Sequence, residues 1–333
     1  MTLNNIRAYV AAVSLLALNV PDSVAAQAAA QVSAKSYPAK PVRLIVPLAP
    51  GGGSDIVARI VGAELTGVWG QSVVVDNRPG AGSTVGTAIA ARAAPDGYTL
   101  LVSSSSLAIS PALYKKLDFD VRRDFSAITL IASQPSILAV HTSVQASTAR
   151  ELVALAKAQP GKLTYASAGT GSATHLGAEL LKYAAGIDLV HVPYKSAGLA
   201  TSALLSGETH LLLTNMASVL PHLNSGRIKA LGISAAKRSP LAPTLPTVAE
   251  SGIAGFEYST WYAMLAPAGT PRPVVHRIQS DIAALLKTPP SRARFVSLGM
   301  EPHGATPAEM DAYLESEIAK WSNVIRAAGV RAD

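Results

Sequence analysis

The chain has 333 residues and no cysteine, which excludes disulfides, thiolate metal sites and cysteine nucleophiles. Charged residues make up 15% and hydrophobic residues 49%, a balance typical of a compact globular protein and not of a disordered one. The formal net charge of +7 comes from scattered lysines and arginines, so we expect mild attraction of anions and no nucleic-acid binding.

The N-terminus has the features of an export signal. Arg7 is followed by an apolar run over residues 8–20, which is about as long as a signal-peptide core and too short to span a bilayer. Small residues at 24–26 fit a cleavage site, so we predict a signal peptide at 1–26 and a disordered lead at 27–36. The competing interpretation is a frayed N-terminal helix. The signal predicts a soluble periplasmic protein.

From residue 42 onward, strand, loop and helix patterns alternate. Strands are expected at 42–46, 73–75 and 99–102, and a helix at about 56–68 with Ser54 or Asp55 as its N-cap. An alanine-rich helix follows residues 77–84, and the third strand runs into four serines at 103–106. The alternation predicts an α/β fold with parallel sheets covered by helices.

The pattern continues through the second half of the chain. Strands are expected at 128–131, 137–140, 163–165, 189–192, 211–213 and 228–233. Helices are expected at 148–160, from the end of the 167–175 loop to Tyr183, and at 197–205. Residues 261–265 are interpreted as a crossover strand, followed by helices from residue 274. Crossings near Ala139 and Tyr258 predict a discontinuous domain 1 (37–138 plus 259–333) and a domain 2 (139–258).

Two glycine-and-hydroxyl loops stand between a strand and a helix, at 50–55 (PGGGSD) and 167–175 (SAGTGSATH). Such loops leave backbone N–H groups free at a helix N-terminus, where the helix dipole favours an anion. Amides and hydroxyls also satisfy a carboxylate without a buried countercharge, whose desolvation is costly. We therefore expect an interdomain cleft that binds a small organic acid.

Seven segments resemble the periplasmic solute-binding receptors of tripartite tricarboxylate transporters, the Bug family. They are 50–55, 77–82 (NRPGAG), 94–100 (APDGYTL), 167–176, 191–195 (HVPYK), 246–252 (PTVAESG) and 266–271 (APAGTP). The resemblance implies a type II periplasmic-binding-protein-like fold, in which two domains close like a flytrap on a carboxylate. It also implies transporter subunits in the membrane as partners, a monomer, and neither cofactor nor enzymatic activity. Ser83 and Thr170 depart from the family pattern, which usually has glycine and asparagine there.

The candidate ligand-binding residues come from the two loops and from neighbouring strand ends. Asp55 has a competing role as a helix cap, because its carboxylate would repel an acid, and His175 has one as a packing or capping residue. Trp261 and Tyr262 are interpreted as core or hinge residues. The candidates are Pro50, Gly51, Gly52, Gly53, Ser54, Asp55, Ser83, Thr84, Ser104, Ser167, Gly169, Thr170, Gly171, Ser172, Thr174, His175 and Asn215.

Two other functions compete with transport. Gly80, Gly82 and Gly86 resemble a dinucleotide-binding loop, which would indicate a nucleotide-dependent oxidoreductase, but their spacing is one residue too long and Asp96 lies in a turn. A receptor that reports to a membrane sensor kinase would carry the same loops as a transport receptor. No motif for a catalytic or metal site was found.

Overall fold

The computed structural model describes residues 37–240 and 242–331, so the expected signal peptide and lead lie outside the described residues. Ten strands of this part of the chain form one sheet, in the order β2-β1-β3-β9-β4-β7-β5-β6, with β8 and β10 paired to β4. Within the described residues, no helix combines the length and apolar character that a bilayer span requires.

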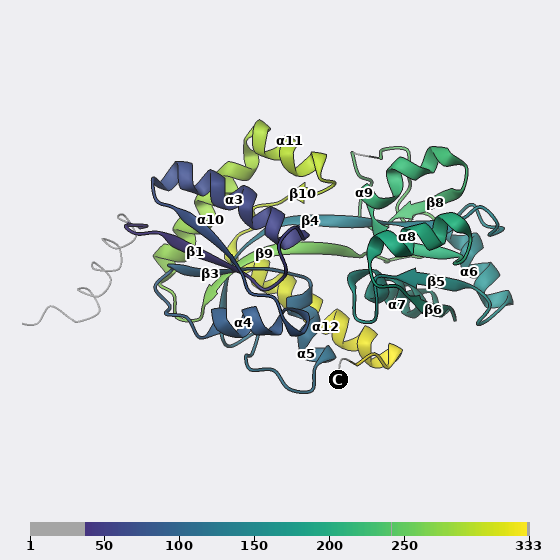
Figure 1. Ribbon diagram of the computed structural model, residues 1–333, viewed down its shortest axis with the longest axis horizontal. Helices are drawn as coiled ribbons and strands as arrows, with labels where there is room; N and C mark the ends of the chain where they lie inside the picture. Colours follow the sequence, from purple (N-terminus) through teal and green to yellow (C-terminus); the bar gives the residue numbers. More distant parts are fainter. Residues whose placement is uncertain (1–36, 241, 332–333) are drawn as a thin grey trace, which may run out of the picture.

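The sheet has two halves, seen at the left and right of Figure 1. Each half is built on three mutually parallel strands, flanked by strands of antiparallel pairing. The first half contains β1 (Val42–Val46), β2 (Val73–Asn77), β3 (Thr99–Ser104) and β10 (Glu301–Pro302). The second contains β5 (Thr164–Ser167), β6 (Val190–Pro193), β7 (Leu211–Asn215) and β8 (Ile228–Ile233).

Strand β4 (Phe125–His141) belongs to both halves and connects them (Figure 1). Residues 125–135 pair with β9 (Ser259–Pro267), and residues 136–141 pair with β7 and β8. Two separate strands had been expected at 128–131 and 137–140, which is wrong. The polar segment between them looks like a loop in the sequence, but β9 supplies partners for it. The division of the chain into two domains at these crossings stays a prediction.

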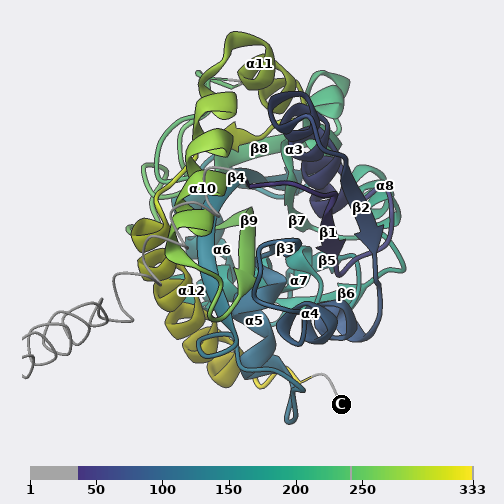
Figure 2. The same ribbon diagram turned by 90° about the vertical axis from the view of Figure 1, so that its left-hand side faces the viewer.

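Helices cover both faces of the sheet, as Figure 2 shows for the first half. The alternation of β1 explains this: Leu44 and Val46 pack with α3 and α10 on one face, while Ile45 packs with α4, α5 and α12 on the other. The helices are α3 (Gly53–Trp69), α4 (Thr84–Ala91), α5 (Ser106–Leu113), α6 (Ala149–Ala158), α7 (Ala173–Ala185), α8 (Ala197–Ser206), α9 (Met216–Val219), α10 (Arg272–Lys287), α11 (Pro289–Ser297) and α12 (Pro307–Ala328).

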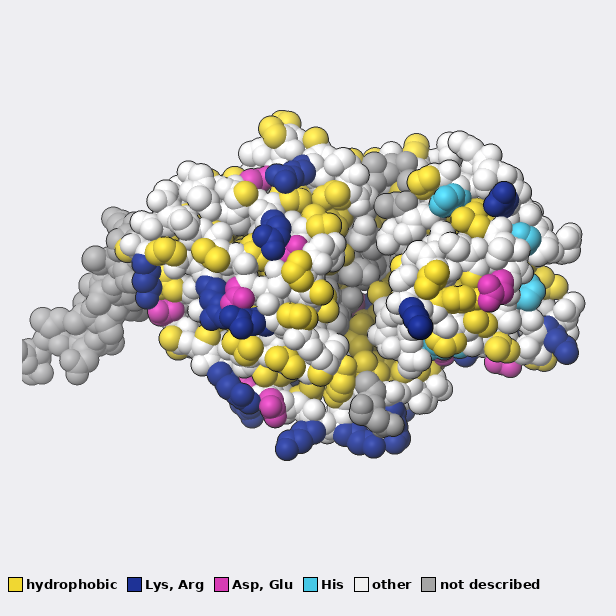
Figure 3. Space-filling view, in the orientation of Figure 1, with side chains coloured by type: hydrophobic (Ala, Val, Ile, Leu, Met, Phe, Trp, Pro, Cys, Tyr) yellow, Lys and Arg dark blue, Asp and Glu magenta, His cyan; other side chains and the backbone are white. Residues whose placement is uncertain are grey.

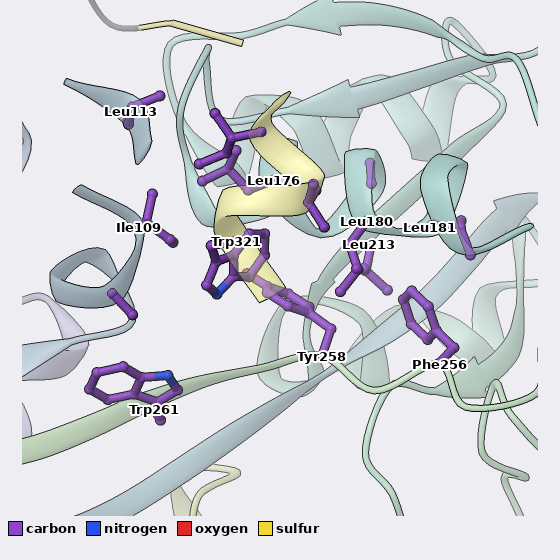
Figure 4. Close-up of a cluster of buried hydrophobic side chains, with 14 of the residues drawn as sticks. Ile109, Leu113, Leu176, Leu180, Leu181, Leu213, Phe256, Tyr258, Trp261 and Trp321 are labelled. Carbon is purple, nitrogen blue, oxygen red and sulfur yellow. The ribbon is translucent and has the colours of Figure 1, made fainter. Parts of the chain in front are cut away.

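One hydrophobic core extends across both halves beneath the sheet. It joins Leu113 of α5 to Leu176 of α7 through α12, whose Trp321 meets Tyr258 edge-on at a ring-centroid distance of 5.9 Å (Figure 4). Thr306 caps helix α12 in a capping box, and the helix runs for 22 residues, long enough to reach both halves. The C-terminal helix is thus a structural connection between the halves.

A buried carboxylate fixes α12 to the crossover strand β9. Glu317 is 3% exposed, and its Oε2 accepts hydrogen bonds from the indole Nε1 of Trp261 at 2.9 Å and of Trp321 at 3.1 Å. Lys320 pairs with the other oxygen of the same carboxylate. Two buried N–H donors therefore depend on one side chain.

We expect Glu317→Leu to lower the free energy of unfolding by about 2–5 kcal/mol, because two buried indole N–H groups lose their acceptor. Urea denaturation of the mature chain measures the loss. Glu315→Leu on the same helix is the matched control, since Glu315 is exposed in an ion pair with Arg122, which is worth at most about 1 kcal/mol. Equal losses in the two variants would contradict the role given to Glu317.

Candidate functional site

Three helices begin where the two halves of the sheet meet, and their N-termini face one cavity of about 540 Å³. The residues at these helix starts are Gly53 and Ser54 for α3, Ser105 and Ser106 for α5, and Ser172 and Ala173 for α7. The rest of the wall is mostly apolar or hydroxyl-bearing: Leu48, Gly82, Ser104, Ile109, Ser110, Leu113, Tyr114, Thr170, Gly171, Thr260 and Tyr262. Both halves of the molecule therefore line one space.

Each of these helix starts presents backbone N–H groups without an intrahelical acceptor. The first backbone hydrogen bonds run from Ile56 to Gly52 in α3, from Ala108 to Ser105 in α5 and from Leu176 to Ser172 in α7. The N–H groups of Gly53, Ser54, Ser106 and Ala173 precede these bonds, so the geometry of the helices leaves them free to donate. Three positive dipole ends consequently converge on one cavity, which favours an anion there.

A second cavity, of about 450 Å³, shares Gly53, Ser172, Ala173, Thr260 and Tyr262 with the first. We call the two cavities together the cleft. The other residues of the second cavity are Ile56, Gln134, Ser136, Ala168, Thr174, Ala197, Thr214, Asn215, Tyr258, Leu298 and Met300. Two joined compartments give room for a ligand with two ends.

The cleft is lined by apolar, hydroxyl and amide side chains and carries no charged side chain. Among the described residues, no lysine, arginine, aspartate or glutamate lines either cavity. Figure 3 shows the charged side chains of that face mostly away from the hollow between the halves. An anion in the cleft would therefore be held by dipoles and hydrogen bonds.

Two buried hydroxyls line the cleft without a partner of their own. Ser54 Oγ and Thr214 Oγ1 belong to side chains that are each 1% exposed, and neither has a hydrogen-bond partner in the described part of the chain. Asn215 Oδ1 accepts two bonds from Ser218, at 3.0 Å each, which turns the amide nitrogen away from that residue. Buried polar atoms are normally paired, so the unpaired Ser54 and Thr214 hydroxyls are candidates for hydrogen bonds to a ligand.

Tyr262 stands between the two cavities and lines both of them. Its hydroxyl donates to Gln134 Oε1 at 3.2 Å, and burial raises the pKa of the phenol to about 12, so it remains a donor at neutral pH. A Cβ on Gly53 would lie 2.1 Å from the Tyr262 hydroxyl oxygen, which explains the glycine at this position. Tyr262 is 4% exposed, as a core residue should be, but the sequence did not indicate its place in the cleft.

In the first loop, Gly53 and Ser54 line the cleft, whereas Pro50, Gly51, Gly52 and Asp55 are outside its lining. Although burial opposes it, ion pairing and hydrogen bonding with Arg59 lower the pKa of Asp55, whose carboxylate also accepts the Gly51 N–H at 2.9 Å. Asp55 therefore organises the loop from within the first turn of α3. The expectation that Ser54 or Asp55 is the N-cap is wrong, because the helix already begins at Gly53 and its N-cap is Gly52, which has no side chain to cap it.

The serine segment after β3 contributes more than the one serine among the candidates. Ser104, Ser105 and Ser106 all line the first cavity, and Ser106 Oγ links Ser104 Oγ and Ser83 Oγ at 3.1 Å each. Ser83 and Thr84 are outside the lining. The start of helix α5 at Ser106 was missed, because four serines in succession look like a polar strand end.

In the second loop, Thr170, Gly171 and Ser172 line the first cavity and Thr174 lines the second. Ser172 also caps α7 by accepting the His175 N–H, and Thr174 Oγ1 accepts the Ala168 N–H at 2.8 Å. Ser167, Gly169 and His175 lie outside the lining. Asn215, at the end of β7, lines the second cavity. No cluster of three or more possible metal ligands occurs among the described residues.

Comparisons with known proteins agree with this geometry. The family model of the tripartite tricarboxylate transporter family receptor (TctC) matches residues 57–330. BugT of Bordetella pertussis is 37% identical over 305 residues, which cover 91% of this chain and 94% of BugT. An R. palustris protein solved with adipate is 33% identical, with a TM-score of 0.74 and coverage of 89% of this chain and 99% of that one.

MatC of Rhodopseudomonas palustris, solved with bound malate, is 31% identical with a TM-score of 0.70, over 87% of this chain and 100% of MatC. These similarities confirm the expected binding-protein fold. They also rule out the oxidoreductase interpretation, since the family and these structural neighbours are binding proteins and not enzymes. The chain belongs to the tripartite tricarboxylate transporter receptor family.

Proposed function

We propose that this protein captures a small carboxylate in the cleft and delivers it to the membrane subunits of a tripartite tricarboxylate-type transporter. The observation that carries the proposal is the convergence of three helix N-termini on a cavity without a charged side chain. Neutral donors hold a carboxylate at a lower desolvation cost than a buried cation would. The adipate and malate bound in related structures are small carboxylic acids of this kind.

The second cavity supports an acid that has a further acceptor group. Thr214 Oγ1 and the amide nitrogen of Asn215 are both donors, and both belong to residues that line this cavity. A second carboxylate, a hydroxyl or an amide carbonyl of the ligand would satisfy them. A dicarboxylate or a hydroxy acid thus fits the two compartments better than a simple fatty acid does.

We place the protein in the periplasm, exported by the signal at 1–26, as a monomer that needs no cofactor. We prefer transport to signalling through a sensor kinase, because the matched family is defined by transporter receptors. Uptake of a radiolabelled acid in cells lacking the gene separates the two roles. Loss of uptake supports transport, whereas normal uptake with loss of an acid-induced transcript supports sensing.

We further propose that residues 37–138 with 259–333, and residues 139–258, are two domains that close on the ligand. The loops that line the cleft come from both parts, while β4, β9 and α12 connect them. The close approach of the two parts supports this: a Cβ added to Gly171 would lie only 3.7 Å from Leu113 Cδ2. Hinge motion about the connecting strands would open and close the cleft.

Ligand class is tested by comparing an acid with its uncharged derivative. We expect malate or adipate to raise the melting temperature of the mature protein, because a ligand that binds only the folded state stabilises it. The corresponding diamide should give no shift, since it lacks the charge that the helix N-termini favour. Equal shifts with acid and amide would show that the site does not select a carboxylate.

Ser54→Ala should weaken binding of the acid by about 1.5–3 kcal/mol, the worth of one hydrogen bond to a charged group, in calorimetry. Stability of the ligand-free protein should stay unchanged or rise slightly, because the Ser54 hydroxyl has no partner among the described residues. Ser103→Ala is the control: its hydroxyl is equally buried and unpaired but lines neither cavity. Weakened binding in the control would point to a general loosening of the fold.

Domain closure should reduce the radius of gyration in small-angle X-ray scattering when saturating acid is added. The reason is that both halves provide lining residues, so a bound ligand holds them together. Identical scattering profiles with and without a ligand of demonstrated affinity would rule out the proposed movement.

A further inference from the structure

Two stacked histidines lie directly behind the second glycine loop. His175 of α7 and His191 of β6 have ring centroids 4.1 Å apart and planes inclined by 20°. Tyr165 of β5 continues the stack, with its ring centroid 4.9 Å from that of His191. His175 is 4% exposed, and neither histidine lines the cleft. The proposed binding of an acid therefore gives these imidazoles no direct role.

The stack is hydrogen-bonded to the backbone of the loop at two glycines. His175 Nδ1 accepts the Gly171 N–H at 3.0 Å. Ser167 Oγ accepts the Gly169 N–H at 3.0 Å and lies 2.6 Å from His191 Nε2. Each histidine thus fixes one peptide group of the loop, directly or through a serine.

These two glycines are the flexible points of the loop. Gly169 has a φ of 110° and Gly171 a φ of 76°, both in the region that other residues rarely adopt. Between and after them lie Thr170, Ser172 and Ala173, which line the cleft. Without bonds from behind, a loop with this backbone freedom would not hold its donors in one arrangement.

A neutral imidazole suits this position because it combines a flat stacking surface with an acceptor nitrogen. Burial lowers the pKa of His175 to about 4, and the neighbouring His191 contributes to the shift. Burial also lowers the pKa of His191. The other titratable groups that face the pair are Glu179 and Lys182 of α7 and Tyr165, whose hydroxyl donates to Glu179. Nδ1 of His175 is therefore an unprotonated acceptor throughout the neutral range.

We propose that His175 and His191 are positioning residues, which hold the second glycine loop from behind so that its donors face the ligand. This inference rests on the proposed function, because it assumes that the loop contacts the acid. It assigns the two histidines a support role. Protonation of His175 on strong acidification would remove the acceptor for the Gly171 N–H and release the loop.

The test uses two substitutions of His175 that differ in whether an acceptor atom remains. In His175→Asn, the side-chain amide oxygen takes the place of Nδ1 as an acceptor that does not titrate, whereas the side chain in His175→Leu offers no acceptor. His276→Leu is the control, since His276 is exposed on α10.

The first measurement needs no ligand. In glycine-selective ¹⁵N spectra of the mature protein, Gly171 is assigned through the loss of its signal in Gly171→Ala. We expect its amide proton to move upfield in His175→Leu, as a donor that loses its acceptor does, and to keep its position in His175→Asn and His276→Leu. An unchanged Gly171 signal in His175→Leu would overturn the proposal.

The second measurement is calorimetry with malate and adipate at pH 7.5. We expect His175→Leu to weaken binding about tenfold, roughly the effect of one misplaced hydrogen bond, and His175→Asn to stay within about threefold of the wild type. Equal weakening in both variants would overturn the proposal. Should the wild type bind neither acid, the choice of ligand fails, while the Gly171 signal still decides the role of His175.

Two further comparisons keep the proposal falsifiable if His175→Leu does not fold. Ser167→Ala removes the acceptor of the Gly169 N–H and leaves the stacked rings in place, so it should move the Gly169 signal upfield and weaken binding. A Gly169 signal that does not move would overturn this half of the proposal. On acidification from about pH 6 to about pH 3.5, across the pKa of His175 of about 4, the Gly171 amide proton of the wild type should move upfield, because the protonated imidazole no longer accepts its N–H, and that of His175→Asn should stay in place. A signal that stays in the wild type, or that moves alike in both proteins, would overturn the positioning role.

Discussion

The arrangement of the whole protein depends on one strand that pairs in both halves of the sheet. Residues 125–135 of strand β4 pair with β9, and residues 136–141 pair with β7 and β8, so the backbone hydrogen bonds of β4 fix where the halves meet. The parallel strands β1 and β5 both have their carboxyl ends at this junction, so the loops that follow them line the same cavity. Helix α12 supports this junction from below through Trp321 and Glu317.

The cleft illustrates how a protein binds an anion without a cation. Gly53, Ser106 and Ala173 mark three helix starts whose free N–H groups supply partial positive charge. A lysine or arginine in the same place would have to lose its hydration to pair with a buried anion. The net charge of +7 remains on the surface, where it attracts anions at long range.

Buried polar groups away from the cleft have a shared role in this fold. Glu317 accepts two indole N–H groups beneath the sheet, and His175 accepts a peptide N–H behind the second loop. Glu317 connects β9, which carries the cleft residues Thr260 and Tyr262, to α12, and His175 connects the second glycine loop to α7. Because an unpaired buried donor is costly, such bonds restrict the backbone more strongly than apolar packing alone.

The sequence by itself determined what depends on neighbouring residues. Strand and helix periodicity, the capping of α7 by Ser172 and the two glycine loops are local patterns, so the α/β class and most helices could be predicted, and Gly53, Ser54, Thr170 and Asn215 do line the cleft. Only the tertiary structure decided the continuity of β4, the contribution of α5, the place of Tyr262 and the pairing of His175 with His191. The partners concerned are far apart in sequence, 128 residues for Tyr262 and Gln134, and no local pattern records which of them meet.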